Sequence, residues 1–316
     1  MSPRQRSTLA LDSASLYYRS FYALPEKMTA PDGRPHNAVR GFLSTVTRLV
    51  DMYAPTALVA CWDADWRPAW RVDLVPTYKA HRVADDGAGD GSGGEAEPES
   101  LGPQAEAIGQ LLDAMGLPRW GVDGYEADDV IGSVATQSAV PCIVVTGDRD
   151  LVQLIDTHTR VLLTVNGGME KWPLIDPVVA LDRFGVPPER YVDLAVLRGD
   201  PSDGLPGVPG IGAKTAAALV LAFGSMDGIL AAASAMTPVR PMTPRLASSL
   251  LENADAIGRA ERVTTVVRDL ELPGPVPSLS GRTGDPDVVA DLAARWGVQR
   301  QVADLLAALD RQTVDE

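Results

Sequence analysis

The chain has 316 residues and a formal net charge of −14, so it is long enough to bury a full-sized core and is strongly acidic. It contains no apolar run of about eighteen residues and no signal-peptide pattern, and we therefore expect a protein without a membrane span that works in the cytoplasm. Two cysteines inside apolar runs and three scattered histidines argue against a disulfide framework and a zinc site.

The pattern of apolar residues predicts strands that alternate with helices. Three short, continuous apolar runs are typical of strands that are covered on both faces. Their alternation with helical patterns predicts an α/β fold with a mainly parallel central sheet flanked by helices. We expect strands at 8–11, 57–62, 142–146 and 161–165, and helices that include 39–52, 106–115 and 127–136.

Between these elements lie two recognisable loops. Residues 85–103 are nearly all small, acidic or polar, and because such a segment cannot offset its ordering entropy by burial, we expect a mobile loop. Asn166-Gly167-Gly168, between 161–165 and 169–172, predicts a hairpin at one edge of the sheet. A helix should follow, with Asp176 and Pro177 at its start and Gly185 at its end.

From about residue 188 the sequence is helical in pattern and rich in Ala, Leu and Arg. This change predicts an α/β core at 1–187 and an all-helical unit at 188–316. The last helices carry apolar stripes that are typical of a buried helix face, such as Val288, Val289, Leu292 and Trp296.

Acidic residues stand at or just beyond the carboxyl ends of three predicted strands. That edge of an open parallel sheet is where ligands bind, so side chains from distant strands meet there. Another acidic group stands at a predicted helix start. Any one of these acids would be an ordinary turn former or helix cap, and the repeated position is the signal. The set is Asp12, Asp63, Glu126, Asp128, Asp129, Asp148 and Asp150.

Carboxylates gathered in one place repel one another. At an effective dielectric constant near 20, two of them about 4 Å apart repel by roughly 4 kcal/mol, so the cluster needs protons or cations. Oxygen ligands favour Mg²⁺ or Mn²⁺, and two such ions in a shared pocket are the apparatus of phosphodiester hydrolysis. No G-x-S-x-G elbow occurs and neither cysteine has a histidine near it in sequence, which argues against a nucleophilic triad.

Six motifs follow one another along the chain. They are LALDSASLYYRSFYAL around Asp12, CWDAD around Asp63, YKAHR at 78–82, GYEADDVIG around Glu126, VVTGDRDLVQL around Asp148 and GDPSDGLPGVPGIGAKTA at 199–216. From about residue 8 to residue 270 this series closely resembles the bacterial 5′ nuclease family, which includes the 5′ nuclease domain of DNA polymerase I and stand-alone flap endonucleases. The resemblance implies a PIN-like core and a metal-dependent 5′-3′ exonuclease or flap endonuclease activity on DNA.

The resemblance also adds residue roles that spacing alone does not assign. It implies Asp200 and Asp203 as further metal ligands. Lys79 and Arg82 would steer the scissile phosphate from a helical arch above the metals, since Arg grips phosphate in a fork and Lys supplies a point charge. The segment 85–103 falls where relatives place this arch.

With these two cations, the acids Asp128, Asp148 and Asp150 complete the expected catalytic set. Tyr78 would stack on a base, with packing as the alternative. Arg19 would contact DNA, with a structural ion pair as the alternative.

The glycine-rich segment from Gly207 to Thr215 is not a P-loop, because Ala213 separates Lys214 from the last glycine and no buried strand precedes it. We expect a glycine hairpin whose second helix presents backbone amides to a DNA phosphate. The resemblance implies a helix-three-turn-helix at about 190–225, with a potassium ion between it and the duplex. The expected DNA contacts there are Gly207, Gly210, Gly212, Lys214 and Thr215, and the surface would be extended by Arg240, Arg245, Arg259 and Arg262.

We therefore predict a structure-specific 5′ nuclease of DNA replication and repair, a monomer that binds DNA with a duplex and a 5′ single-stranded flap or end. The acidic net charge argues against binding phosphates unless the surplus acid lies in the metal pocket and in segment 85–103. Two alternatives stay open: a PIN-type ribonuclease with the same core, and a catalytically inactive module that binds DNA structures.

Overall fold

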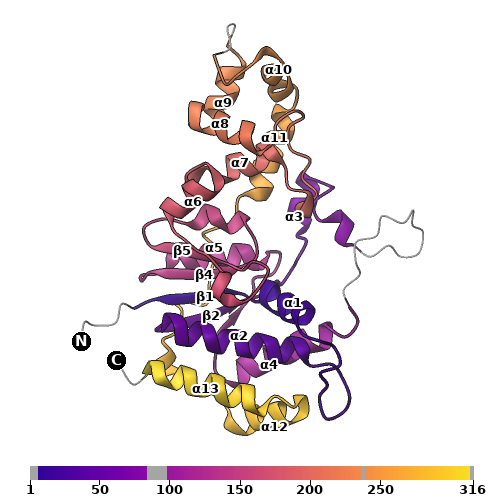
Figure 1. The fold of residues 1–316 in the computed structure, drawn as a ribbon, viewed down its shortest axis with the longest axis vertical. Helices are drawn as coiled ribbons and strands as arrows, with labels where there is room; N and C mark the ends of the chain where they lie inside the picture. Colours follow the sequence, from indigo (N-terminus) through magenta and orange to yellow (C-terminus); the bar gives the residue numbers. More distant parts are fainter. Residues whose placement is uncertain (1–5, 84–97, 236–238, 314–316) are drawn as a thin grey trace.

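The structure is a computed structural model that describes residues 6–83, 98–235 and 239–313. Its strands are β1 (Thr8–Asp12), β2 (Ala57–Cys61), β3 (Arg119–Trp120), β4 (Cys142–Thr146), β5 (Thr159–Leu163) and β6 (Leu174–Ile175). They form one sheet in the order β3-β2-β1-β4-β5-β6, which crosses the middle of the molecule (Figure 1). The first five strands are parallel and β6 is antiparallel to β5.

Helices cover both faces of this sheet (Figure 1). The α-helices are α1 (Ser13–Ala23), α2 (Asn37–Tyr53), α3 (Ala69–Leu74), α4 (Gly102–Ala114), α5 (Ala127–Gln137), α6 (Pro177–Phe184), α7 (Tyr191–Arg198), α8 (Ala213–Phe223), α9 (Met226–Ala233), α10 (Pro244–Glu252), α11 (Ala254–Thr264), α12 (Pro286–Trp296) and α13 (Gln299–Thr313). The 3₁₀ helices are η1 (Ala80–Arg82), η2 (Asp150–Leu154), η3 (Met169–Lys171), η4 (Pro188–Arg190), η5 (Pro201–Asp203) and η6 (Leu279–Gly281).

Two apolar cores lie on the two faces of the sheet, because successive side chains of a strand point in opposite directions. Ala10 and Val144 belong to the core that contains residues of α5 and α7 to α11. Leu9 and Val145 belong to the core that contains residues of α2, α4, α12 and α13. The central strands are therefore buried on both sides, as their continuous apolar runs predict.

The four predicted strands are confirmed, with ends that differ by at most two residues. The predicted hairpin at the sheet edge is also present as the antiparallel pair of β5 and β6. Its returning strand is Leu174–Ile175 rather than 169–172, because η3 occupies Met169–Lys171. Strand β3 was not predicted, since two residues are too few to show a period.

Helix α6 has the predicted caps. The Asp176 side chain accepts from the backbone N–H groups of Val178 and Val179, both at 2.9 Å, and Gly185 adopts a left-handed backbone with φ of 76°. The mobile loop predicted at 85–103 covers residues 85–97, which lie outside the described residues. Residues 98–101 form a turn before α4, which begins at Gly102.

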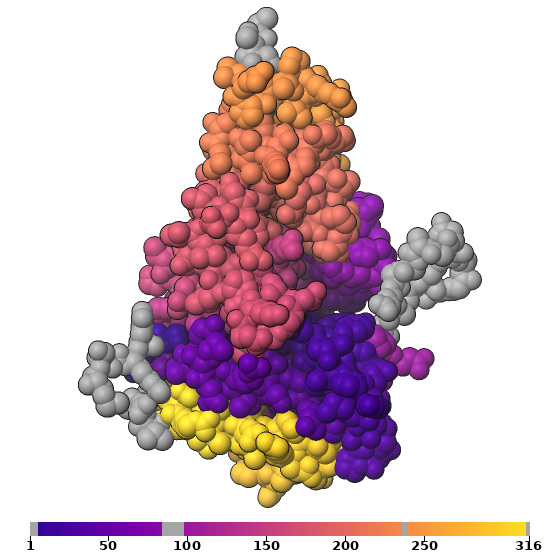
Figure 2. All heavy atoms as spheres, in the orientation of Figure 1, coloured from indigo at the N-terminus to yellow at the C-terminus, as the bar shows by residue number. Residues whose placement is uncertain are grey.

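The last two helices, α12 and α13, pack on a different part of the molecule from α7 to α11. In Figure 1, α7 to α11 stand on one side of the sheet and α12 and α13 lie at the opposite end, where α13 packs on α2 and α12 on α4. Figure 2 shows the same division as a narrow orange upper part and a yellow base. The single helical unit expected at 188–316 is therefore not observed as one packed body, and the boundary near residue 188 stays a prediction.

The apolar stripe of α12 explains this placement. Val289, Leu292 and Trp296 are buried in the core of the α2 face, as predicted, whereas Val288 is exposed. The Trp296 ring lies under the Arg34 guanidinium at 4.5 Å, and the Trp296 carbonyl is 2.6 Å from Nδ1 of His36. The C-terminal helices thus complete the core of the α/β sheet.

Both cysteines are buried and unbonded, as predicted. Burial raises the pKa of Cys142 to about 12, so its thiol stays neutral.

Within the described ranges no single helix has the length and apolar character to cross a bilayer. Only α8 and α9 taken together, across a bend of 91°, have that length and composition.

The packing of α13 can be tested at Leu305, which is fully buried in the α2 core. We expect Leu305→Ala to lower the free energy of unfolding by about 2–5 kcal/mol, because it leaves a cavity that the core cannot close. Urea denaturation measures this loss. The exposed Val288→Ala is the matched control and should change stability by less than about 0.5 kcal/mol. An equally small effect at Leu305 would contradict the seating of α13 on the core.

Candidate active site at the carboxyl edge of the sheet

The strand order changes direction between β1 and β4. The chain proceeds from β1 to β2 and β3 on one side, and then continues with β4 and β5 on the other. In open α/β sheets, ligands bind outside the carboxyl ends of the strands at such a switch point. Here Asp12 ends β1, and Asp148 follows β4 after Gly147. A cavity of about 1240 Å³ opens at this point.

The cavity wall is built from charged residues that are far apart in sequence. Its carboxylates come from the ends of β1, β2 and β4, from the start of α5 and from the turn after α7. They are Asp12, Asp63, Asp128, Asp148 and Asp200, and the basic residues of the wall are Lys79, Arg82, Arg149 and Arg198. The structure therefore brings five of the predicted acids and both predicted catalytic cations to one cavity.

Hydrogen bonds fix the acids of the wall. Asp12 caps α1 by accepting from Ser15 N–H at 3.0 Å, and its other oxygen accepts from the Thr146 hydroxyl at 2.7 Å. Asp63 accepts from the N–H of Ala127 at 2.8 Å, which ties the end of β2 to α5. The positions of these acids thus follow from the strand ends and from the start of α5.

Burial and crowding make these carboxylates hard to ionise together. Burial, with added repulsion from Asp63 and Asp148, raises the pKa of Asp12 to about 7 from an ordinary value of 3.8. The pKa of Asp128 is raised well above its ordinary value by burial and by the charges of Asp148 and Asp12. The crowded carboxylates are therefore stabilised by bound protons or cations.

Asp150 and Asp203 are buried beside this wall. Burial, followed by the charges of Asp148 and Asp203, raises the pKa of Asp150 well above its ordinary range. Its Oδ1 atom is buried and has no hydrogen-bond partner among the described residues. Burial also raises the pKa of Asp203, against the opposing effect of Lys79. A buried carboxylate oxygen without a partner is a position that a cation would satisfy.

The donor set fits divalent cations that prefer oxygen, such as Mg²⁺ and Mn²⁺. Among the residues that the structure describes, no three His, Cys, Asp or Glu side chains converge closely enough to hold one ion by themselves.

Glu126 and Asp129, which were predicted as metal ligands, do not line the cavity. Both oxygens of Asp129 accept from the Arg71 guanidinium at 2.8 Å and the carboxylate is fully buried, so the geometry does not support Asp129 as a ligand. Glu126 accepts from the Lys79 ammonium at 3.0 Å and lies 3.3 Å from Arg71. Its charge is already met by two cations, and the geometry does not support it as a ligand.

Two further residues predicted to contact DNA have partners within the protein, and their DNA contacts stay predictions. Tyr78 is 3% exposed and its hydroxyl donates to Glu126 at 2.9 Å, so it packs in the interior. Arg19 donates to the carbonyls of Val165 and Gly167 and lies 5.0 Å above the Trp172 ring. Arg19 thus holds the turn after β5. The alternative prediction for Arg19 was a structural ion pair, but its partners here are two backbone carbonyls.

Lys79 and Arg82 line the cavity, although not from an α-helix. Lys79 has a left-handed backbone with φ of 48° just before η1, and Arg82 is the last residue of η1. Arg82 donates to the Ser202 carbonyl at 2.7 Å and is 3.4 Å from Asp203. The segments fit together because Gly204, with φ of 71°, has no Cβ that would collide with the carbonyl of Thr77.

The glycine hairpin lies between α7 and α8, as predicted. Gly207 packs so closely on Gly199 that a Cβ would collide, whereas the space beside Gly210 and Gly212 is open. No side chain caps the first turn of α8, and its first residue, Ala213, lines the cavity. The exposed Lys214 follows, with Thr215 half-buried beside it. The start of α8, directly after the hairpin, therefore reaches the same cavity as the acids.

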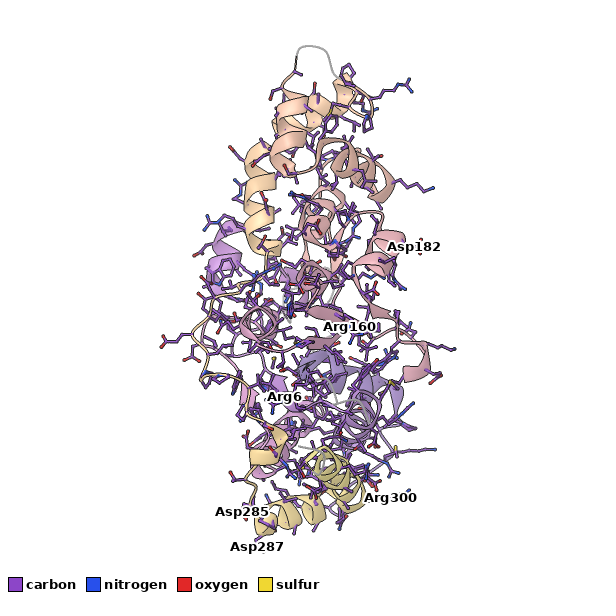
Figure 3. The ribbon with its side chains drawn as sticks, turned by 90° about the vertical axis from the view of Figure 1, so that its left-hand side faces the viewer. Arg6, Arg160, Asp182, Asp285, Asp287 and Arg300 are labelled. Carbon is purple, nitrogen blue, oxygen red and sulfur yellow. The ribbon has the colours of Figure 1, made fainter. Side chains whose placement is uncertain are left out.

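Exposed charges also occur far from the cavity. Figure 3 shows Asp285 and Asp287 at the start of α12, at the end of the molecule opposite to the hairpin, and Asp182 on α6. The expectation that the surplus acid lies in the pocket and in segment 85–103 therefore accounts for only part of it. The four arginines expected downstream, Arg240, Arg245, Arg259 and Arg262, are all exposed.

Sequence reasoning missed three basic residues near the site. Arg149 lies inside the TGDRD motif and Arg198 directly precedes GDPSD, so their neighbours offered a signal. Arg71 offered none, because a single arginine on a short amphipathic helix is usually solvated, yet it is only 2% exposed.

Comparison with known proteins agrees with this geometry. A family model described as the 5′-3′ exonuclease N-terminal resolvase-like domain matches residues 7–185, and its C-terminal SAM-fold counterpart matches 186–287. A 5′-3′ exonuclease of Streptomyces coelicolor is 46% identical, over 95% of this chain and 99% of the relative. Another from Mycobacterium tuberculosis is 44% identical, over 96% and 98%.

The fold also resembles that of a solved nuclease. The bacteriophage T5 flap endonuclease, in a complex with DNA and metal ions, superposes with a TM-score of 0.66. The match covers 96% of this chain and 100% of that one at 17% identity, so it shows a common fold.

The crowding of carboxylates predicts how stability depends on pH. Because the pKa of Asp12 is raised to about 7 in the fold, its protonated form is favoured there, and this contribution is present below about pH 4 and lost as the pH rises through 7. The metal-free protein, kept in a chelator, should melt at lower temperature at pH 8 than at pH 5.5. Asp12→Asn should flatten this dependence, while the exposed Asp182→Asn should keep it. An unchanged slope in Asp12→Asn would contradict the crowded site.

Proposed function

The chain belongs to the 5′-3′ exonuclease family, and from that premise we propose that it hydrolyses DNA phosphodiesters at 5′ flaps and 5′ ends with divalent metal ions held in the carboxylate cavity. The observation that carries this proposal is the shared cavity, because crowded carboxylates, two catalytic cations and the uncapped start of α8 all meet there. Together these groups can bind metal ions and a phosphate in one place, which metal-assisted hydrolysis of a phosphodiester requires.

The proposed metal-holding residues are the acids of the wall and the two buried beside it. They are Asp12, Asp63, Asp128, Asp148, Asp150, Asp200 and Asp203. When bound, Mg²⁺ or Mn²⁺ would supply an activated water and stabilise the leaving oxygen. In this arrangement the protein contributes fixed orientation, since Thr146 and the N–H groups of Ser15 and Ala127 hold Asp12 and Asp63.

Lys79 and Arg82 are proposed to bind the scissile phosphate. Lys79 is 8% exposed and lines the cavity, so burial shields its point charge from much of the screening by bulk water. Arg82 is exposed and keeps further N–H donors beyond its bond to Ser202. Together they would stabilise negative charge that develops on the phosphate oxygens.

The hairpin is proposed to hold the duplex. Free backbone N–H groups at the start of α8 attract phosphate, and the open space beside Gly210 and Gly212 lets a DNA strand approach the backbone. Lys214 adds a charge at the same place. A potassium ion at this hairpin, implied by the family resemblance, is part of the proposal. Sequence preference should be weak because phosphates carry no sequence information.

The metal pocket is tested by removing one acid at a time. Asp148→Ala or Asp150→Ala should slow cleavage of a 5′-flap substrate by roughly a hundredfold or more, while binding of the same DNA stays measurable. A chelator should stop the wild-type enzyme, and added Mg²⁺ or Mn²⁺ should restore it. The exposed Asp182→Ala should cleave normally. Full activity in either pocket variant would refute the proposal.

The hairpin contact is tested by salt dependence. Lys214→Ala should weaken binding to DNA that contains a duplex, and should reduce the slope of log affinity against log salt by about one, because one phosphate contact is lost. Arg300→Ala on α13, which Figure 3 places at the opposite end of the molecule, is the control and should keep the slope. An unchanged slope in Lys214→Ala would remove Lys214 from the phosphate contacts.

A further inference from the structure

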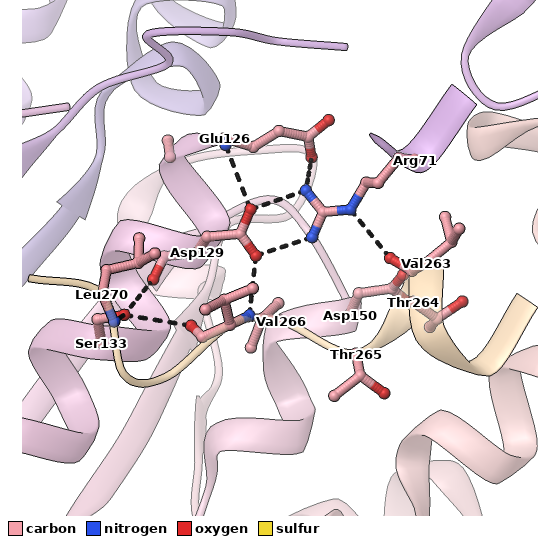
Figure 4. A network of polar contacts seen from close by, with 12 residues as sticks. Arg71, Glu126, Asp129, Ser133, Asp150, Val263, Thr264, Thr265, Val266 and Leu270 are labelled. Carbon is pink, nitrogen blue, oxygen red and sulfur yellow. Dashed lines mark hydrogen bonds and ion pairs between the residues drawn. The ribbon is translucent and has the colours of Figure 1, made fainter. Parts of the chain in front are cut away.

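Arg71 on α3 is a charged side chain that the interior encloses almost completely. It is 2% exposed, and among the described residues it is the largest side chain that is fully buried. Figure 4 shows its guanidinium between the start of α5 and the segment that follows α11. An arginine can be buried only if its N–H groups and charge are met, so its partners show what it does.

Those partners belong to two parts of the chain outside α3, the start of α5 and the end of α11. Two nitrogens of Arg71 donate to the two oxygens of Asp129 on α5, each at 2.8 Å, and its Nε donates to the carbonyl of Val263 at 3.1 Å. Asp129 in turn accepts from the N–H of Val267 at 2.8 Å. The fork therefore joins α3, the start of α5 and residues 263–267, which end α11 and follow it.

The same guanidinium shares the charge of Glu126 with Lys79. Arg71 lies 3.3 Å from Glu126, and the Lys79 ammonium donates to the same carboxylate at 3.0 Å. If Arg71 were absent, Lys79 would be the one of these two cations left to neutralise Glu126. The ammonium would then be drawn from the cavity wall towards the interior.

Stability alone is a weak reason for such a pair. Replacing a buried ion pair with apolar residues of similar volume is often neutral or stabilising, because two charges no longer have to leave water. Orientation is a better reason, since a fork of two hydrogen bonds fixes direction as well as distance. The group whose direction matters here is Lys79.

We propose that Arg71 is a positioning residue for Lys79, acting through Glu126 and Asp129. This inference rests on the proposed function, in which Lys79 binds the scissile phosphate. The fork holds Asp129 and the start of α5 in place, and its charge leaves the Lys79 ammonium at the cavity wall. Arg71 itself touches neither the DNA nor the cavity.

The test separates positioning from folding. Arg71→Met alone strands the buried charge of Asp129 and should lower the melting temperature strongly. Arg71→Met/Asp129→Leu removes both charges and should recover most of that loss. We expect this folded double variant to cleave a 5′ flap roughly tenfold to a hundredfold more slowly than wild type in single turnovers, with flap affinity in a chelator unchanged.

The decisive comparison repeats the pair of substitutions in a Lys79→Met background. If Arg71 acts through Lys79, the double substitution should slow that enzyme by less than about threefold more, since the coupling is already lost. Equal losses in both backgrounds, or normal cleavage by the double variant, would overturn the inference and leave the proposed function standing. Normal cleavage by Lys79→Met alone would remove Lys79 from the proposed function and overturn the inference with it.

Two variants guard this design. Arg71→Lys keeps the charge but cannot form the fork. If Arg71→Met/Asp129→Leu melts below the assay temperature, Arg71→Lys takes its place in the comparison with and without Lys79→Met. Arg119→Met removes a comparable fork on Asp113 that lies on the surface. Its cleavage rate should equal that of wild type.

A readout without cleavage is available because the chain has four lysines. Lys79 is buried, whereas Lys27, Lys171 and Lys214 are exposed, so the Lys79 ammonium should give the protected signal in a ¹⁵N-lysine NMR spectrum. That signal should shift or broaden in Arg71→Met/Asp129→Leu without DNA or metal. An unchanged signal would contradict the positioning of Lys79 by Arg71.

Discussion

Repulsion among carboxylates at one edge of the sheet is the constraint on which the rest of this structure depends. The switch point between β1 and β4 gathers the acids, and burial makes their joint ionisation unfavourable. The fold meets the constraint in two ways. Glu126 and Asp129 receive the buried cations Lys79 and Arg71. Within the described residues Asp12, Asp63, Asp128 and Asp148 form no ion pair, and we propose that cations from solution neutralise them.

This division gives the cavity its proposed chemistry. A wall of oxygen ligands suits hard divalent ions, and the start of α8 extends the same cavity towards a phosphate backbone. Neither alternative reading explains both features. A ribonuclease with this core has no evident use for the hairpin that we propose to bind a duplex, and an inactive binding module would have no need for crowded buried acids. The family match to 5′-3′ exonucleases agrees with the cavity as a whole.

The sequence was sufficient where a local pattern decides the structure. Continuous apolar runs located β1, β2 and β4, and the position of Asp12, Asp63 and Asp148 beyond them located the cavity. It failed where a tertiary partner decides. Asp128 and Asp129 are adjacent acids in one helical turn, and only the position of Arg71 shows that one faces the cavity and the other the interior. Likewise, helical periodicity predicted α12 and α13 but could not tell which surface their apolar stripes would cover.

The most direct measurement is a crystal structure of the protein soaked in Mn²⁺, with the anomalous signal of manganese used to locate the ions. The account predicts manganese within the cavity, beside Asp12, Asp128 and Asp148, while Glu126 stays bound to Lys79 and Asp129 to Arg71. Manganese absent from this cavity, or bound by Asp129 in place of Arg71, would contradict the sorting of acids from which the site and its proposed chemistry are derived.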